Sequence, residues 1–177
     1  MRTVFCAPYT LEPQVPEHAH EMFAVLSDPA IYEFENSPPT SEEWLRTRFK
    51  RLETRSSSDG KEHWLNWVIR LPNGRLAGYV QATVVESGTA CVAYEINSEY
   101  WRQGIGSCTV LAMLQELEHQ YAVTGFVAVL KAENYRSKAL LLKLGFSAAG
   151  TEQQEKYRDE PDELVMLRAV SSATNAA

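Results

Sequence analysis

The sequence has no long apolar run. None of its hydrophobic stretches approaches the roughly 20 residues that a membrane-spanning helix requires. The first residues, Met1–Pro8, are too few, and meet a proline too soon, to form the apolar region of a signal peptide. We therefore expect a cytoplasmic protein without a membrane partner.

Cysteine is also scarce. The chain has three cysteines, Cys6, Cys91 and Cys108, and no Cys-x-x-Cys pair, so we expect reduced thiols rather than a disulfide framework. His18 and His20 are two residues apart and would point to different sides of a helix, and no Cys/His cluster follows them. No metal site is predicted.

Basic residues are outnumbered by acidic ones. The 17 Lys and Arg residues against 23 Asp and Glu residues give a net charge of −6. This balance disfavours non-specific nucleic-acid binding, for which clustered basic side chains supply most of the affinity, and it suits a cationic acceptor such as an amine. The length of 177 residues fits one domain with a sizeable core, which we place at residues 1–170, followed by a flexible tail at 171–177.

The most informative motif that is present covers Trp101–Ser107. It lies between a strand-like run, Ala90–Ile96, and a run with apolar residues at helical spacing. The missing Cβ atoms of Gly104 and Gly106 let a ligand approach the backbone, and the free N–H groups of a helix start suit a pyrophosphate. A plain tight turn would look the same. A Walker A loop is excluded because Gly-Lys-Ser/Thr is absent, and a dinucleotide fingerprint because Thr109 stands where a third small residue is needed.

A second motif, Asn134–Phe146, follows the strand-like run Gly125–Leu130. Gly-x-Gly opening a helix, then a strand, then Asn-x-x-Ser and a short helix ending in Lys-Leu-Gly-Phe resembles the GNAT superfamily of acyl-CoA-dependent N-acetyltransferases. Asn-x-x-Ser in particular resembles the branch with the ribosomal-protein N-terminal alanine and serine acetyltransferases. The resemblance implies an α/β (α+β) fold whose mixed, mostly antiparallel sheet of about seven strands is flanked by helices.

Patterning along the chain predicts the elements. Helices are expected from Pro16 or Glu17 to Ser27, after the capping residues Thr40–Glu43, over Gly104–Gln120 and over Ser137–Leu144. The expected strands lie within Val4–Glu12 and at His63–Arg70, Arg75–Glu86, Thr89–Ile96, Thr124–Leu130, Ala149–Tyr157 and Glu163–Ala169.

The resemblance also implies the site residues. Acetyl-CoA would bind to the chain at Tyr94, Ile96, Arg102, Gln103, Gly104, Ile105, Gly106, Ser107, Asn134 and Ser137. Trp101 departs from the family's usual basic residue. Ser137 is the candidate donor to the leaving thiolate, because Leu141 stands where many relatives have a tyrosine; the alternative is that Ser137 is only the N-cap of a helix.

The acceptor is expected to be a primary amine, either a protein N-terminus or a small molecule. Glu95 is the acid nearest the expected reaction centre, although strand alternation could turn it to solvent. Glu33 and Glu35 could line the amine pocket or be solvated loop charges. We predict an N-acetyltransferase that works through a ternary complex, and a homodimer is compatible with this prediction. The alternative is a non-catalytic acyl-CoA-binding or regulatory domain.

Overall fold

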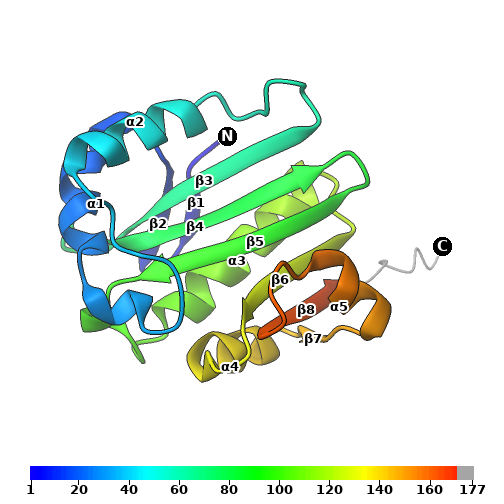
Figure 1. Ribbon diagram of the computed structural model, residues 1–177. Helices are drawn as coiled ribbons and strands as arrows, with labels where there is room; N and C mark the ends of the chain where they lie inside the picture. Colours follow the sequence, from blue (N-terminus) through cyan, green and yellow to red (C-terminus); the bar gives the residue numbers. More distant parts are fainter. Residues whose placement is uncertain (171–177) are drawn as a thin grey trace.

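Eight strands form one mixed sheet in the computed structural model, which describes residues 1–170 (Figure 1). The predicted tail at 171–177 lies outside the described residues. The order across the sheet is β1-β2-β3-β4-β5-β6-β8-β7. The strands are β1 (Val4–Cys6), β2 (Tyr9–Pro13), β3 (Glu62–Arg70), β4 (Leu76–Val85), β5 (Thr89–Ile96), β6 (Gly125–Lys131), β7 (Ser147–Ala148) and β8 (Glu163–Ala169). The helices are η1 (Pro16–His18), α1 (Ala19–Leu26), η2 (Pro29–Tyr32), α2 (Glu42–Leu52), η3 (Ser98–Tyr100), α3 (Ile105–Gln120), α4 (Tyr135–Lys143) and α5 (Thr151–Tyr157).

The sheet separates two apolar layers. On one face α1 and α2 bury a cluster that includes Met22, Phe49 and Val68. On the opposite face α3 and α4 cover the larger core, which includes Trp67, Met113 and other fully buried side chains (Figure 1). Removing this apolar surface from water provides the main driving force for folding.

The strands β3 to β5 form an antiparallel meander, as the sequence predicts, and β2 pairs antiparallel with the other edge of β3. In the pairing of β3 with β4, Glu62 lies opposite Val85, and in the pairing of β4 with β5, Gly78 lies opposite Ile96. At Gly78 the backbones are so close that an added Cβ would lie 2.0 Å from the Glu95 carbonyl oxygen. Glycine is therefore required there for β4 to approach the end of β5.

Strands β5 and β6 are parallel and pair only at their beginnings. The paired residues run from Thr89 opposite Gly125 to Cys91 opposite Val127. Beyond these positions the two strands diverge, while β6 remains paired with β8 along its other side up to Lys131. The divergence opens the sheet at the point where β5 ends and α3 begins.

Two expectations were wrong. The first predicted strand is a hairpin of two short strands, β1 and β2. The predicted strand at Ala149–Tyr157 is instead the helix α5, preceded by the two-residue β7. Five of the seven residues of α5 are Glu, Gln or Lys, which favour helix over strand.

Candidate functional site

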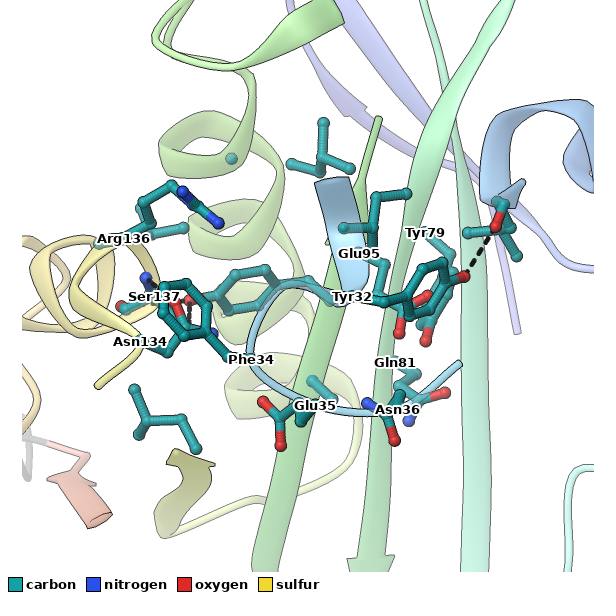
Figure 2. Close-up of a pocket in the computed structure, with 18 of the residues that line it drawn as sticks. Tyr32, Phe34, Glu35, Asn36, Tyr79, Gln81, Glu95, Asn134, Arg136 and Ser137 are labelled. Atoms are coloured by element: carbon teal, nitrogen blue, oxygen red, sulfur yellow. Dashed lines mark hydrogen bonds between the residues drawn. The ribbon is translucent and has the colours of Figure 1, made fainter. Parts of the chain in front are cut away.

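A cleft of about 1140 Å³ lies where β5 and β6 diverge. It is lined by the ends of these strands, by α2, by the first turns of α3 and α4, and by the loop of residues 31–39. Figure 2 shows this loop, with Phe34, Glu35 and Asn36, passing across the cleft between the start of α4 and the strands β4 and β5.

The glycine motif forms one wall of the cleft. Gly104 caps α3 in the left-handed region, with φ of 81°, and no side chain caps this helix start. A Cβ on Gly104 would have no heavy atom within 4 Å, so the backbone there is open to a ligand. Because the first N–H groups of a helix lack partners within the helix, this turn suits an anionic group such as a pyrophosphate.

Five of the six residues predicted from the motif line the cleft: Arg102, Gly104, Ile105, Gly106 and Ser107. Gln103 does not; its side-chain amide donates to the carbonyl of Glu99 at 2.8 Å. Gly106 packs so closely that a Cβ would lie 3.1 Å from Leu140 and 3.3 Å from Ile96. The two glycines thus differ: Gly104 faces open space, and Gly106 lets α3 approach α4 and β5.

The start of α4 carries a pair of hydroxyl groups. The hydroxyl of Ser137 lies 2.8 Å from that of Tyr94, and both side chains line the cleft. Burial raises the pKa of Tyr94 to about 12, so its phenol stays protonated at neutral pH. The alternative that Ser137 is the N-cap is wrong, because Asn134 holds that position and its Oδ1 accepts from the Ser137 amide at 3.0 Å.

Glu95 lies inside the cleft rather than toward solvent. Its carboxylate faces the rings of Tyr32 and Tyr79 (Figure 2). Burial raises the pKa of Glu95, while Tyr79, Arg48 and Tyr32 oppose this rise. A carboxyl with a raised pKa in a cleft is the usual property of a residue that accepts a proton.

The two acids of the loop have different positions. Glu35 lines the cleft, and burial raises its pKa, with Lys131 acting in the opposite direction. Glu33 instead pairs with Arg136, its Oε2 lying 2.6 Å from the guanidinium Nη2. Of the two predicted amine-binding acids, the structure therefore brings only Glu35 to the cleft.

Sequence reasoning missed two amide residues of the cleft, Gln14 and Gln81, which lie on either side of Asn66 in the sheet. The backbone amide of Gln14 donates to the Asn66 carbonyl at 2.9 Å, and Asn66 pairs with Gln81 in the register of β3 and β4. Gln14 and Gln81 line the cleft, and Gln14 Nε2 is buried without a hydrogen-bond partner among the described residues. Only the alternation of Tyr79 and Gln81 along β4 could have indicated that these side chains share a face.

Arg48 of α2 and Arg136 of α4 also line the cleft and were not predicted. The Arg48 guanidinium lies 5.8 Å from the centre of the Trp44 ring and forms no ion pair within residues 1–170. Among the same residues, no group of three His, Cys, Asp or Glu side chains is placed to hold a metal ion. No helix of this part of the chain is long and apolar enough to cross a membrane.

Residues 9–147 match the model of a family described as "Acetyltransferase (GNAT) domain". No curated protein matches the chain.

Several solved structures share the fold at low sequence identity. RimL, a ribosomal L7/L12 α-N-protein acetyltransferase in complex with coenzyme A, has 17% identity and a TM-score of 0.80, over 95% of this chain and 98% of RimL. Mycobacterium smegmatis RimJ in complex with CoA-disulfide has 17% identity and a TM-score of 0.78, over 98% and 87%. The microcin C7 self-immunity acetyltransferase MccE, in complex with acetyl-CoA and AMP, has 17% identity and a TM-score of 0.76, over 92% of each chain.

Proposed function

The chain belongs to the GNAT acetyltransferase family, and from this membership we propose that it transfers an acetyl group from acetyl-CoA to a primary amine. The acceptor in this proposal is a protein N-terminus or a small amine, bound together with acetyl-CoA in one ternary complex. The single observation that carries the proposal is the cleft, which joins the open helix start at Gly104 to the carboxyl group of Glu95.

Acetyl-CoA fits the wall formed by α3 and β5. The backbone amides from Gly104 to Ser107 would hold the pyrophosphate, and the positive charge of Arg102 would add to this attraction. Tyr94 and Ile96 belong to the part of β5 that has no strand partner on the β6 side, so this edge of the strand can pair with the pantetheine arm. The Ile96 carbonyl is already occupied, because it accepts a hydrogen bond from Trp101 Nε1 at 2.7 Å. The structures of RimL and MccE contain coenzyme A and acetyl-CoA, which supports this assignment.

Glu95 is the proposed proton acceptor. An amine attacks only in its neutral form, and a carboxylate in the cleft can take the proton that the amine loses. An α-amine, with a pKa of about 7.7 to 8.0, is already partly neutral at cellular pH, whereas a lysine side chain near 10.4 needs more help. On this ground an α-amine is the preferred acceptor in the proposal.

Ser137 and Tyr94 are the proposed donors to the leaving group. When the new C–N bond has formed and the C–S bond breaks, negative charge collects on the departing sulfur. The Ser137 hydroxyl, itself 2.8 Å from the Tyr94 hydroxyl, can donate a hydrogen bond to that charge. Leu141 cannot, because it has no polar group and is 1% exposed in the core.

The non-catalytic alternative remains a defined outcome of the test. Free thiol release from acetyl-CoA would be followed over a panel of amines and of hexapeptides with free N-terminal serine or alanine, with binding of acetyl-CoA measured by calorimetry. Turnover on any acceptor would support the enzyme. Tight binding without turnover would support an acyl-CoA-binding domain, and the absence of binding would reduce the glycine motif to a tight turn.

A further inference from the structure

The guanidinium of Arg136 in α4 contacts four side chains. Its Nη2 lies 2.6 Å from Glu33, and its Nη1 donates to the Tyr135 hydroxyl at 3.1 Å. Its central carbon lies 4.4 Å from the ring centre of Trp101, 4.9 Å from that of Phe34 and 5.2 Å from that of Tyr135. We call these five residues the Arg136 clasp.

The clasp joins three segments that line the cleft. Glu33 and Phe34 come from the loop of residues 31–39, Trp101 from the glycine motif, and Tyr135 from α4. The rings of Phe34 and Tyr135 also meet edge to face, with centres 5.9 Å apart. The clasp therefore fastens the loop to the start of α4, across the cleft.

The loop has little else to hold it. Residues 34–40 lie in no helix or strand, and no backbone hydrogen bond to or from them is found within residues 1–170. Phe34 and Glu33 are thus the tethers of a segment that also carries Glu35 and Asn36 into the cleft.

We propose that Arg136 is a positioning residue for the acceptor, because it fixes the loop that places Glu35 and Asn36 beside the acceptor amine. This proposal rests on the proposed function. A planar guanidinium can stack on several rings and pair with a carboxylate at the same time, whereas a lysine ammonium retains only the charge.

The effect should be confined to the acceptor. Trp101 has an anchor of its own, since its Nε1 donates to the carbonyl of Ile96 at 2.7 Å. Loss of Arg136 therefore frees the loop but leaves the glycine motif attached to β5. Binding of the acceptor should weaken, and binding of acetyl-CoA should not.

Steady-state kinetics of Arg136→Ala, Arg136→Lys and Glu33→Gln would test this, with a hexapeptide bearing a free N-terminal serine as the acceptor. We expect Arg136→Ala to raise the KM for the peptide about tenfold or more while the KM for acetyl-CoA changes less than twofold. Arg136→Lys and Glu33→Gln should fall between the wild type and Arg136→Ala, because each keeps part of the clasp. The control is Lys143→Ala, an exposed cation of the same helix in no ion pair among the described residues.

Equal changes in both KM values, or no change in either, would overturn the proposal. If Arg136→Ala does not fold, as judged by circular dichroism, the two milder variants decide the question.

Proteolysis of the protein without any ligand separates this proposal from the proposed function. A protease that cleaves after glutamate should cut the Glu35–Asn36 bond faster in Arg136→Ala than in the wild type or Lys143→Ala, with the cleavage site identified by mass spectrometry. Equal cleavage rates would show that the clasp does not hold the loop. A wild-type protein whose loop resists cleavage but that shows no turnover on any acceptor would instead overturn the enzymatic function, and with it the acceptor role.

Discussion

The hydroxyl groups of Tyr94 and Ser137 lie 2.8 Å apart, one at the end of β5 and the other in the first turn of α4. The two side chains thus link β5 to the helix that follows β6 along the chain. Because both line the cleft, they are the hydroxyl groups that we propose as donors to the sulfur of acetyl-CoA.

We predict that Ser137→Ala and Tyr94→Phe each lower kcat by about tenfold or more, with the KM for acetyl-CoA within about twofold, because a hydrogen bond to a charged group contributes roughly 1.5 to 3 kcal/mol. The double variant should lose less than the product of the two single losses, because the two hydroxyls act as one unit. Kinetics equal to the wild type in Ser137→Ala would remove its role in catalysis.

Replacing Glu95 by glutamine should lower kcat/KM by roughly 10² to 10⁴, the usual contribution of a general base. Burial raises the pKa of Glu95, so the wild-type rate should fall as pH drops through a value above that of an exposed glutamate, and this limb should vanish in Glu95→Gln. Glu86→Gln, at an exposed position outside the cleft, is the control. A variant that retains the wild-type pH profile would exclude Glu95 as the base.

The same pKa shift predicts a dependence of stability on pH. Because the pKa of Glu95 is higher in the folded than in the unfolded protein, the folded state binds more protons between the two values. The contribution of Glu95 to stability is therefore fully present below the unfolded pKa and is lost as pH rises through the folded one. Urea unfolding should show Glu95→Gln gaining stability relative to the wild type as pH rises from about 4 to 7, whereas a constant difference would contradict the prediction.

Gly104→Val should weaken acetyl-CoA binding by more than about tenfold, because the added side chain would occupy the space before the amides of α3. Valine at this positive φ also strains the backbone, so a matched control is needed. Gly74→Val, with φ of 85° and no heavy atom within 4 Å of the added Cβ, has the same strain in a turn outside the cleft. If calorimetry measures the wild-type affinity for acetyl-CoA in both variants, the phosphate site lies elsewhere.

Gly78→Ala should destabilise the protein by roughly 2 kcal/mol or more, because its Cβ would meet the backbone of Glu95 and Ile96 rather than a movable side chain. The control is Gly125→Ala in β6, where the nearest atom would be the Arg168 carbonyl oxygen at 3.9 Å. If thermal unfolding shows the same decrease in Tm for both variants, the close approach of β4 and β5 is not the cause of the destabilisation.

Local patterns in the sequence predicted the parts of the fold that they determine. The alternation in β3 to β5 and the glycines before α3 are visible in short windows, and these elements lie where they were expected. The strand predicted in the region of α5 was wrong. Its seven residues carry no apolar periodicity to oppose the helix preference of Glu, Gln and Lys. Edge elements of this kind are fixed by few tertiary contacts.

The candidate site was predictable only where one segment supplies it. The parts of the cleft around Gly104 and Ser137 are each formed by one continuous segment, and the sequence motifs indicated both segments. The contacts of Arg136 join residues from positions 33, 34, 101 and 135, and no spacing in the sequence relates these positions. The cap at Asn134 was assigned to Ser137 as an alternative because both residue types favour that position, and only the backbone geometry distinguishes them.

The short parallel pairing of β5 with β6 has a consequence for the mechanics of the molecule. Within residues 1–170, strand pairing joins the N-terminal strands of the sheet to the β6-β8-β7 portion at only three residue pairs, from Thr89 with Gly125 to Cys91 with Val127. One backbone hydrogen bond, from the Thr124 amide to the Gly88 carbonyl at 2.9 Å, lies beside them. Beyond Cys91, a molecule lodged between the two strands would take over hydrogen bonds that another strand would otherwise supply. A bound molecule would then stiffen the junction of the two portions. The protein with a molecule bound between β5 and β6 should therefore resist heat, proteases and deuterium uptake better than the protein without one.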